Sequence, residues 1–383
     1  MKQQNNNATN SAGACKETCV DMIEDICAAK NVSFHPAHVA RDIMSKDVKM
    51  VTLDHTVKDC IDFMKLHKVR HAPVVDGPNE KGGKPYFVGV ISERDLLRQI
   101  WPHAGQFHGE NADHKSCEQR MVHIVIRKPK CVSPETPIPN VILTMINNKI
   151  DMVPVLSDTN IVGIITTMDI IKCLFEIHDE IRRLCPEIRE GRKPVDPDST
   201  SLLQYPFLHK WFSLKVQEIM TKQVVRLGLH QTLAKAIEVL RKKHFRHLPI
   251  ADKQGVLKGI ISDRDVLRNL PPSNKHSSTK TRPFDSDIFD VDPRIMILDL
   301  PLARIMTWDI TTISPGCDVY DAAETLYKMR ISCLPAVDEG KKLCGIVTVT
   351  DLMHALLLLY RAPPESSCLM KKDEHKTQNI YNI

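Results

Sequence analysis

One motif of seven residues occurs four times along this chain of 383 residues. In each copy a glycine and an aspartate lie six positions apart, with serine or threonine midway between them. The copies occupy residues 89–95, 163–169, 259–265 and 345–351. Such an internal repeat constrains the fold more than any other feature of the sequence, because each copy is expected to build the same supersecondary unit.

The residues upstream of each motif repeat as well. Leu233, Ile237 and Leu240 show the spacing of an amphipathic helix, and a strand-like segment with a proline follows. Three copies open with Ile-Met, 29 residues before that proline. We expect the second copy to open at Arg120 and Met121, which places its methionine 33 residues before the proline. Each copy therefore predicts the order β-α-β-β-α.

A unit of about 55 residues buries too little surface to be stable alone. Its strands are apolar on both faces, as in residues 161–165, and so require a partner. We therefore expect an α+β fold in which neighbouring repeats pair.

The combined pattern resembles the CBS domain, a family that works in tandem pairs called Bateman modules. The resemblance covers residues 39–176 and 214–360. With four repeats, the chain is similar to the gamma subunit of AMP-activated protein kinase and to stand-alone CBS regulatory proteins. The resemblance implies two Bateman modules packed as a disk.

The predicted domain organisation alternates repeats with polar segments. Its parts are a disordered N-terminal segment with a short helix (1–38), repeat 1 (39–101), repeat 2 (118–176), a linker (177–213), repeat 3 (214–271), a polar linker (272–301), repeat 4 (302–360) and a disordered tail (361–383).

The recurring motif has the residue types that a nucleoside site needs. Glycine lets a backbone approach a ligand closely, and a carboxylate accepts hydrogen bonds from both hydroxyls of a ribose. In CBS proteins the Ser/Thr and Asp have such roles. Here they correspond to Ser92 and Asp95, Thr166 and Asp169, Ser262 and Asp265, and Thr348 and Asp351. The alternative interpretation is an ordinary helix N-cap with an acidic first turn.

Basic residues distinguish repeats 1 and 3 from repeats 2 and 4. By resemblance to the kinase gamma subunit, they would meet nucleotide phosphates, for which arginine offers a planar fork. These residues are Arg70, His71, Arg94, Arg246, His247 and Arg264. The alternatives are solvated arginines and histidines packed at the edge of the core.

Composition excludes several classes of protein. The net charge of +5 comes without a basic stripe, so we expect no binding of nucleic acid. No apolar run is long enough for a membrane span, and the first residues lack the pattern of a signal peptide, so we expect a cytoplasmic protein. The 12 cysteines lack zinc spacing and are expected to be free thiols, with Cys15 and Cys19 in a polar tail.

The sequence thus predicts a regulatory protein for energy sensing, without catalytic or metal-binding residues. It requires no cofactor. AMP, ADP and ATP are the expected ligands, with S-adenosylmethionine, cyclic di-AMP and NADH as alternatives. The regulated partner is a kinase, a transporter or an enzyme, and the protein forms a monomeric disk or a homodimer. Two alternatives stay open, namely a scaffold with vestigial clefts and the regulatory part of an enzyme of the IMP dehydrogenase type.

Overall fold

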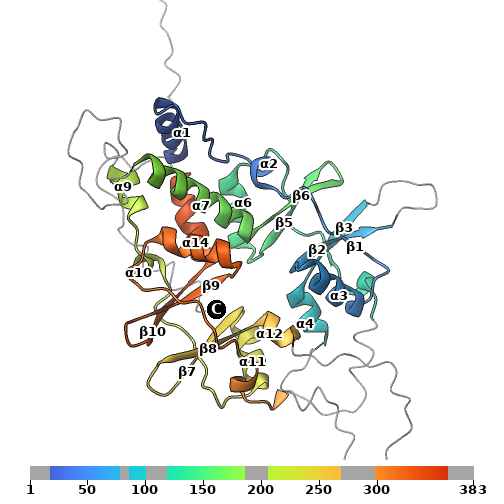
Figure 1. The fold of residues 1–383 in the computed structure, drawn as a ribbon. Coiled ribbons are helices and arrows are strands. Elements are labelled where there is room, and N and C mark those ends of the chain that lie inside the picture. The colour runs from blue at the N-terminus through green and yellow to red at the C-terminus, as the bar shows by residue number, and fades with distance from the viewer. Residues whose placement is uncertain (1–17, 78–85, 101–118, 186–205, 269–297, 361–383) are drawn as a thin grey trace, which may run out of the picture.

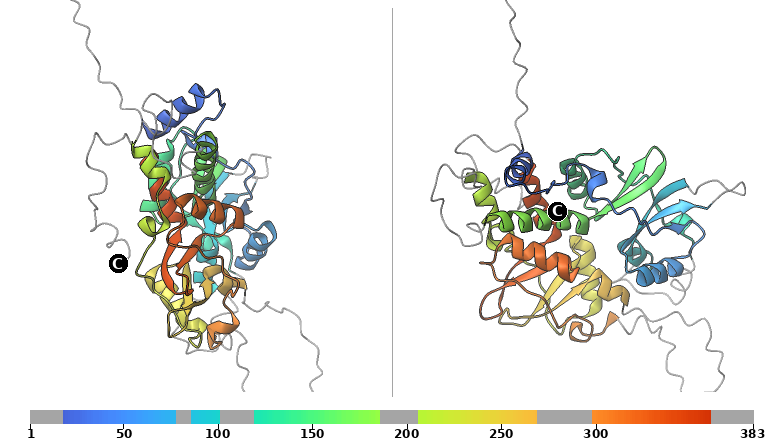
Figure 2. Two further views of the ribbon diagram at one scale, coloured as in Figure 1. Left: turned by 60° about the vertical axis from the view of Figure 1, so that its left-hand side comes forward. Right: turned by 45° about the horizontal axis from the view of Figure 1, so that its top comes forward.

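The computed structural model describes residues 18–77, 86–100, 119–185, 206–268 and 298–360. Figure 1 shows four similar units around a common centre, and Figure 2 shows them from two further directions. Repeat 1 consists of α2 (Ala40–Ile43), β1 (Val51–Thr52), α3 (Val57–His67), β2 (His71–Asp76), β3 (Tyr86–Ser92) and α4 (Glu93–Ile100). Repeat 2 consists of η1 (Met121–His123), β4 (Ile126–Arg127), α6 (Ile138–Asn147), β5 (Met152–Ser157), β6 (Asn160–Thr166) and α7 (Thr167–Leu184).

The second half of the chain repeats this order. Repeat 3 consists of α10 (Val216–Ile219), α11 (Leu233–Lys243), β7 (His247–Ala251), β8 (Leu257–Ser262) and α12 (Asp263–Arg268). Repeat 4 consists of η3 (Leu302–Arg304), α14 (Val319–Met329), β9 (Cys333–Val337), β10 (Leu343–Thr348) and α15 (Val349–Leu359). Among the described residues, two helices lie outside the repeats, α1 (Cys19–Ala29) and α9 (Pro206–Phe212). The predicted α+β class with four repeats is confirmed, while the packing of the modules into a disk stays a prediction.

Helix α3 shows how the local sequence builds each unit. Thr56 and Asp59 form a reciprocal cap at its start, which satisfies N–H groups that the helix itself leaves without partners. Val57, Cys60 and Met64 are buried along one face. The helix then ends at a residue in the left-handed conformation. The four repeats share this turn, with φ between 52° and 55°, at Lys68, at Lys149 just after the end of α6, at His244 and at Arg330.

The hairpin of each repeat is extended by its partner within the module. Residues after the opening Ile-Met pair with the last strand of the partner repeat, as in Ser45 with Ile164 and Thr307 with Ile260. In repeat 1 the added strand is β4, which pairs with β3. Each repeat therefore contributes a segment to its neighbour's sheet, and this exchange explains why a single repeat is not expected to fold alone.

The motif glycine serves this exchange. A Cβ atom on Gly163 would lie 2.7 Å from the sulfur of Met44, and one on Gly345 would lie 2.5 Å from the sulfur of Met220. Met306 crosses Gly259 in the same manner. Only glycine leaves room for this crossing. The sequence-based expectation that the glycine opens a path to a ligand is therefore wrong, because the opening segment of the partner repeat occupies that side.

The residue that opens repeat 2 also differs from the one expected from the sequence. Gly89 is covered by Val125 and by the backbone of Ile126, not by Met121. Val125 lies 29 residues before Pro154, as the methionines do in the other repeats. Met121 is buried one helical turn earlier. The expected start at Met121 was therefore four residues early. Met121 matches the opening methionine of the other repeats in residue type, but Val125 is the residue that matches it in position.

Two hydrophobic cores cross the module boundary. One joins repeats 2 and 4 and includes α1 and α9, and the other joins repeats 1 and 3. Cys19 is buried in α1, so placing it in a polar tail was wrong. Within the segment expected to be a linker, α7 continues to Leu184, where the sequence indicates a connecting helix, and Trp211 of α9 is buried. The structure describes no helix that is long and apolar enough to span a membrane.

Candidate functional site

The motif Ser/Thr and Asp form a reciprocal cap at the last helix of every repeat. In repeats 1 and 3, the serine N–H and hydroxyl donate to one carboxylate oxygen, at 3.0 and 2.5 Å for Ser92 and Asp95, and at 2.8 and 2.7 Å for Ser262 and Asp265. In repeats 2 and 4, both bonds are 2.7 Å, for Thr166 with Asp169 and for Thr348 with Asp351. All four motifs therefore have the hydrogen bonds that the interpretation as a helix N-cap predicts.

The cap engages the Oδ2 atom of each aspartate, and in Asp169 and Asp265 the Oδ1 atom faces the partner repeat. Oδ1 of Asp169 accepts a long hydrogen bond of 3.4 Å from Ser45, and Oδ1 of Asp265 one of 3.5 Å from Thr307. Burial raises the pKa of Asp169 and raises that of Asp351 to about 6. A hydroxyl-rich ligand between the two repeats could therefore reach Oδ1 without breaking the cap.

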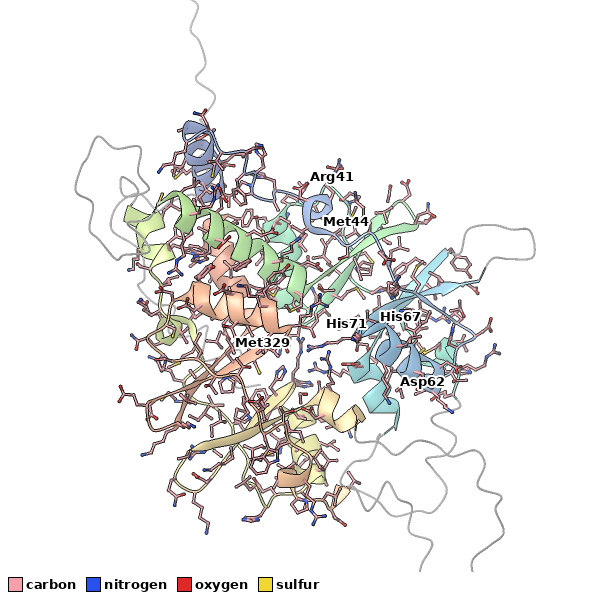
Figure 3. The ribbon with its side chains drawn as sticks, viewed as in Figure 1. Arg41, Met44, Asp62, His67, His71 and Met329 are labelled. Carbon is pink, nitrogen blue, oxygen red and sulfur yellow. The ribbon has the colours of Figure 1, made fainter. Side chains whose placement is uncertain are left out.

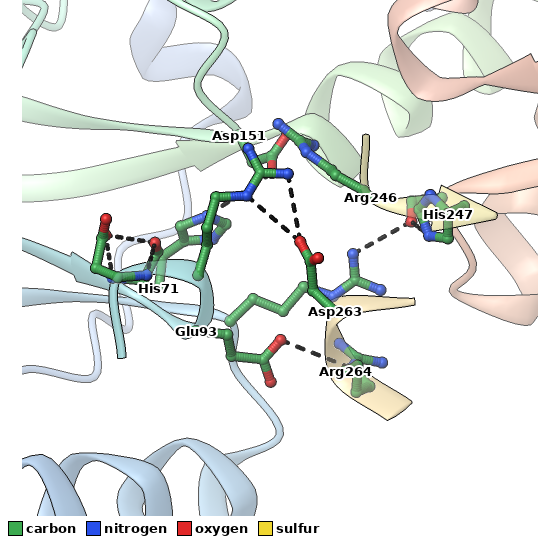
Figure 4. A network of polar contacts seen from close by, with 12 residues as sticks. His71, Glu93, Asp151, Arg246, His247, Asp263 and Arg264 are labelled. Atoms are coloured by element: carbon green, nitrogen blue, oxygen red, sulfur yellow. Dashed lines mark hydrogen bonds and ion pairs between the residues drawn. The ribbon is translucent and has the colours of Figure 1, made fainter. Parts of the chain in front are cut away.

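The residues three positions before each strand proline meet at the centre of the molecule. They are Arg70, Asp151, Arg246 and Ser332, one from each repeat. Arg246 of repeat 3 pairs with Asp151 of repeat 2, and Arg70 of repeat 1 donates to the Ser332 hydroxyl of repeat 4 at 3.2 Å. Both contacts join the two modules, and Figure 4 shows the polar network around them.

The two histidines complete this arrangement. Nε2 of His71 lies 3.9 Å from a carboxylate oxygen of Asp151, and Nε2 of His247 lies 3.0 Å from the Ser332 hydroxyl. In Figure 3, His71 lies at the centre, whereas Asp62 and His67 lie on the outer side of the same repeat. His71 and His247 therefore occupy equivalent positions in two related halves of the cluster.

A second set of ion pairs joins repeats 1 and 3 directly. The arginine before each motif aspartate reaches across to the acid that opens the opposite helix. Arg94 contacts Asp263 at 3.3 Å, and Arg264 contacts Glu93 at 3.8 Å. These reciprocal contacts join α4 and α12, and Figure 4 shows the contact of Arg264 with Glu93. With side chains that are 27% and 30% exposed, Arg94 and Arg264 are partly buried in these contacts.

The electrostatics of this cluster favour an anion. Burial, reinforced by the surrounding arginines, lowers the pKa of both His71 and His247 to about 3. Burial and the neighbouring Arg94 and Arg70 lower the pKa of Arg246 to about 9. Burial raises the pKa of Asp263. Because the arginines lower the pKa of both histidines and of Arg246, the field at these groups opposes any further positive charge.

The structure brings all six predicted basic residues to this cluster. The three acids and Ser332 were not predicted as part of it. Asp151 and Ser332 could have been found, because they occupy the repeat position of Arg70 and Arg246. Glu93 and Asp263 carried a weaker signal, since an acid at a helix start is usually explained by the helix dipole alone.

Comparison with known proteins identifies the repeats. The family model of the CBS domain matches residues 40–102, 122–176, 216–272 and 302–358. Protein MJ1404 of Methanocaldococcus jannaschii is 24% identical over 315 residues, which is 82% of this chain and 60% of that protein. This chain thus spans about three fifths of the length of that relative.

Two solved structures are also similar to this chain. One is protein MJ1225 of the same archaeon, which is described as an archaeal homologue of the γ subunit of AMP-activated protein kinase. The match covers 83% of this chain and 99% of the MJ1225 chain. The TM-score is 0.61 at 20% identity, so this likeness supports the fold. CBSX2, solved in complex with AMP, covers 38% of this chain and 98% of its own, with 23% identity and a TM-score of 0.30. Because four matches to the family model cover more than half of its residues, this chain belongs to the CBS domain family.

Proposed function

We propose that this protein is a regulatory sensor that binds adenine nucleotides between its repeats. The convergence of Arg70, Arg94, Arg246 and Arg264 at the contact between the modules is the observation that carries the proposal. Arginine forks are suited to phosphate oxygens, and partial burial strengthens the attraction. AMP, ADP and ATP supply the required negative charge, whereas S-adenosylmethionine carries no phosphate.

The motif aspartates supply a complementary place for the ribose. Asp95 directly follows Arg94, and Asp265 directly follows Arg264. A ribose against Oδ1 of either aspartate would therefore have its phosphates on the side of the arginines. The cap and the ligand use different carboxylate oxygens, so both interpretations of the motif can hold together.

Regulation would follow from competition for the arginines. In the structure, Arg94 pairs with Asp263, and Arg246 pairs with Asp151. Phosphate oxygens would compete for the same guanidinium groups, so ligand binding would change the free energy of the contact between the modules. A kinase, a transporter or an enzyme that senses this contact would be the regulated partner.

A second candidate function is a scaffold with vestigial clefts, favoured by the complete caps. If the motif aspartates serve only as caps, the repeats need no ligand to fold. Both functions are regulatory rather than catalytic, and they differ in one measurable property, the affinity for a nucleotide.

Titration calorimetry on the full chain tests the proposal. Asp95→Ala and Asp265→Ala should weaken ADP binding by about 5- to 150-fold, which corresponds to roughly 1–3 kcal/mol for donors left without a partner. The double variant Arg70→Ala/Arg246→Ala should weaken ADP binding more than adenosine binding, because the arginines meet only the phosphates.

Asp59→Ala is the matched control, since Asp59 makes the same reciprocal cap at α3, in the outer part of repeat 1. All three aspartate variants should lose about 0.5–2 kcal/mol of stability, but Asp59→Ala should keep its ADP affinity. Wild-type ADP affinity in both Asp95→Ala and Asp265→Ala would contradict the placement of the nucleotide at these aspartates, whereas a wild-type chain that binds no ADP would favour the scaffold.

A further inference from the structure

The central cluster consists of two halves that are equivalent in geometry but not in charge. One half contains Arg246, Asp151 and His71, and the other contains Arg70, Ser332 and His247. In each half an arginine from one module meets a residue of the other module, and a histidine approaches that same residue. The halves differ at one position, where Asp151 in the first corresponds to Ser332 in the second.

This difference determines how the charge of each arginine is compensated. Asp151 supplies a carboxylate to Arg246, while Ser332 offers Arg70 a neutral hydroxyl. Arg94 and Arg264 have Asp263 and Glu93 as counterions. Among these four arginines, Arg70 is therefore the one whose contact across the modules is a neutral hydroxyl and not a carboxylate.

The Ser332 half also has hydrogen-bonding groups suited to an anion. Ser332 is buried, and its hydroxyl contacts both Arg70 and His247. When a phosphate oxygen replaces the hydroxyl as the acceptor for Arg70, the hydroxyl can donate to that phosphate or to His247. In the Asp151 half, a phosphate must approach a carboxylate that already bonds to Arg246, and two anions repel one another in a partly buried site.

We propose that Asp151 and Ser332 make the two phosphate subsites unequal, so that the Ser332 half binds the phosphate end of a nucleotide first and Asp151 suppresses binding in the other half. This assignment rests on the proposed function, since it concerns the same cluster. In it, Asp151 acts as an internal counterion that takes the place of a second phosphate. The protein then has one strong and one weak phosphate subsite, although its repeats would allow two equal ones.

The matching positions of the two halves permit an exchange experiment with ADP as the probe and adenosine as the control without phosphate. Ser332→Asp should weaken the strong ADP site by about 10- to 100-fold, as expected when an anion meets a buried carboxylate, and should change adenosine affinity much less. Asp151→Ser should strengthen the weak site until calorimetry detects two sites of similar affinity. The double exchange Asp151→Ser/Ser332→Asp should restore a single strong site.

Arginine variants show which half holds the strong site. Arg70→Ala should remove it from the wild-type protein but not from the double exchange, and Arg246→Ala should do the reverse. If Ser332→Asp does not fold, as judged by its thermal melt, Asp151→Asn provides the same test by removing the charge while nearly keeping the shape. It should strengthen the weak site as Asp151→Ser does.

The outcomes separate this assignment from the function on which it rests. Suppose that the wild-type chain binds ADP, that Ser332→Asp leaves the strong site unchanged and that neither Asp151 variant strengthens the weak site. These results would overturn the proposal that the two phosphate subsites are unequal, but not the proposal that the protein is a nucleotide sensor. Loss of the strong site in Arg246→Ala rather than Arg70→Ala would overturn the assignment of the halves. The absence of any ADP binding to the wild-type chain would overturn both proposals.

Discussion

Two of the contacts between the modules differ in the balance of their chemistry. Between repeats 2 and 4, α7 packs against α14 and α15, and Phe175 stacks on Tyr320 and Tyr327 at 5.7 and 5.5 Å. Nearby, His178 stacks on Trp211 at 4.5 Å. Between repeats 1 and 3, α4 meets α12 through the apolar core that the two repeats share and through the reciprocal ion pairs of Arg94 and Arg264.

Because of this difference, we expect the two contacts to have different roles. Burial of aromatic surface responds little to small anions, so the contact between repeats 2 and 4 can hold the modules together in any ligand state. Partly exposed ion pairs are screened by salt and compete with phosphate. We therefore expect a ligand with phosphate groups to act on the ion pairs between the modules, including those of Arg94 and Arg246, rather than on the aromatic contact.

The largest effect is expected from removing an aromatic anchor of the first contact. Trp211 is 2% exposed and donates from its indole nitrogen to the Ala355 carbonyl at 2.8 Å. Trp211→Ala should reduce the free energy of unfolding by about 3–5 kcal/mol, measured by urea denaturation. Trp308→Ala is the control, because Trp308 is 58% exposed and its loss should cost less than about 1 kcal/mol. Similar losses in both variants would contradict the importance of the aromatic contact.

The next effect concerns pH. Burial lowers the pKa of His178 to about 3, and neither ring nitrogen of His178 has a hydrogen-bond partner. Below about pH 6.5 the unfolded chain binds a proton that the folded chain does not, so stability is full above that pH and falls towards pH 3. Each such histidine contributes a slope of up to about 1.4 kcal/mol per pH unit.

Three histidines contribute to this slope, because the pKa of His71 and His247 is lowered in the same direction. His178→Phe should remove one contribution, measured as the change in unfolding free energy between pH 7 and pH 5. Inorganic phosphate should reduce the contributions of His71 and His247 but not that of His178. An equal response of the wild-type protein and His178→Phe to pH would show that His178 is not held neutral.

The smallest effect is expected at the ionic contact. Arg94 and Asp263 are 27% and 22% exposed, so a double-mutant cycle with Arg94→Ala and Asp263→Ala should give a coupling energy of about 0.5–1.5 kcal/mol. Glu93→Gln should cost less, because Arg264 lies 3.8 Å from Glu93. Raising NaCl to about 1 M should reduce the coupling, since the Debye length then falls to about 3 Å. A coupling energy that does not change with salt would contradict the proposed sensitivity of this contact.

The repeated features were predictable because they depend on neighbours in the chain. The cap of α3, the turn at Lys68 and the pairing of β2 with β3 each involve residues close in sequence. The motif glycine was found but misinterpreted, since the methionine that crosses it comes from another repeat. The start of repeat 2 was misplaced for the same reason, because only the pairing of β4 with β3 shows which residue crosses Gly89.

The amino-acid sequence by itself determined the four repeats, their secondary structure, the caps of their last helices and the uneven distribution of arginine among them. Tertiary structure alone decided that Arg246 meets Asp151, and that Arg94 meets Asp263 across 169 positions of the chain. The physical reason is that equivalent residues have nearly identical local surroundings in every repeat. Their partners therefore depend on how the two modules pack, which joins repeat 1 to repeat 3 and repeat 2 to repeat 4.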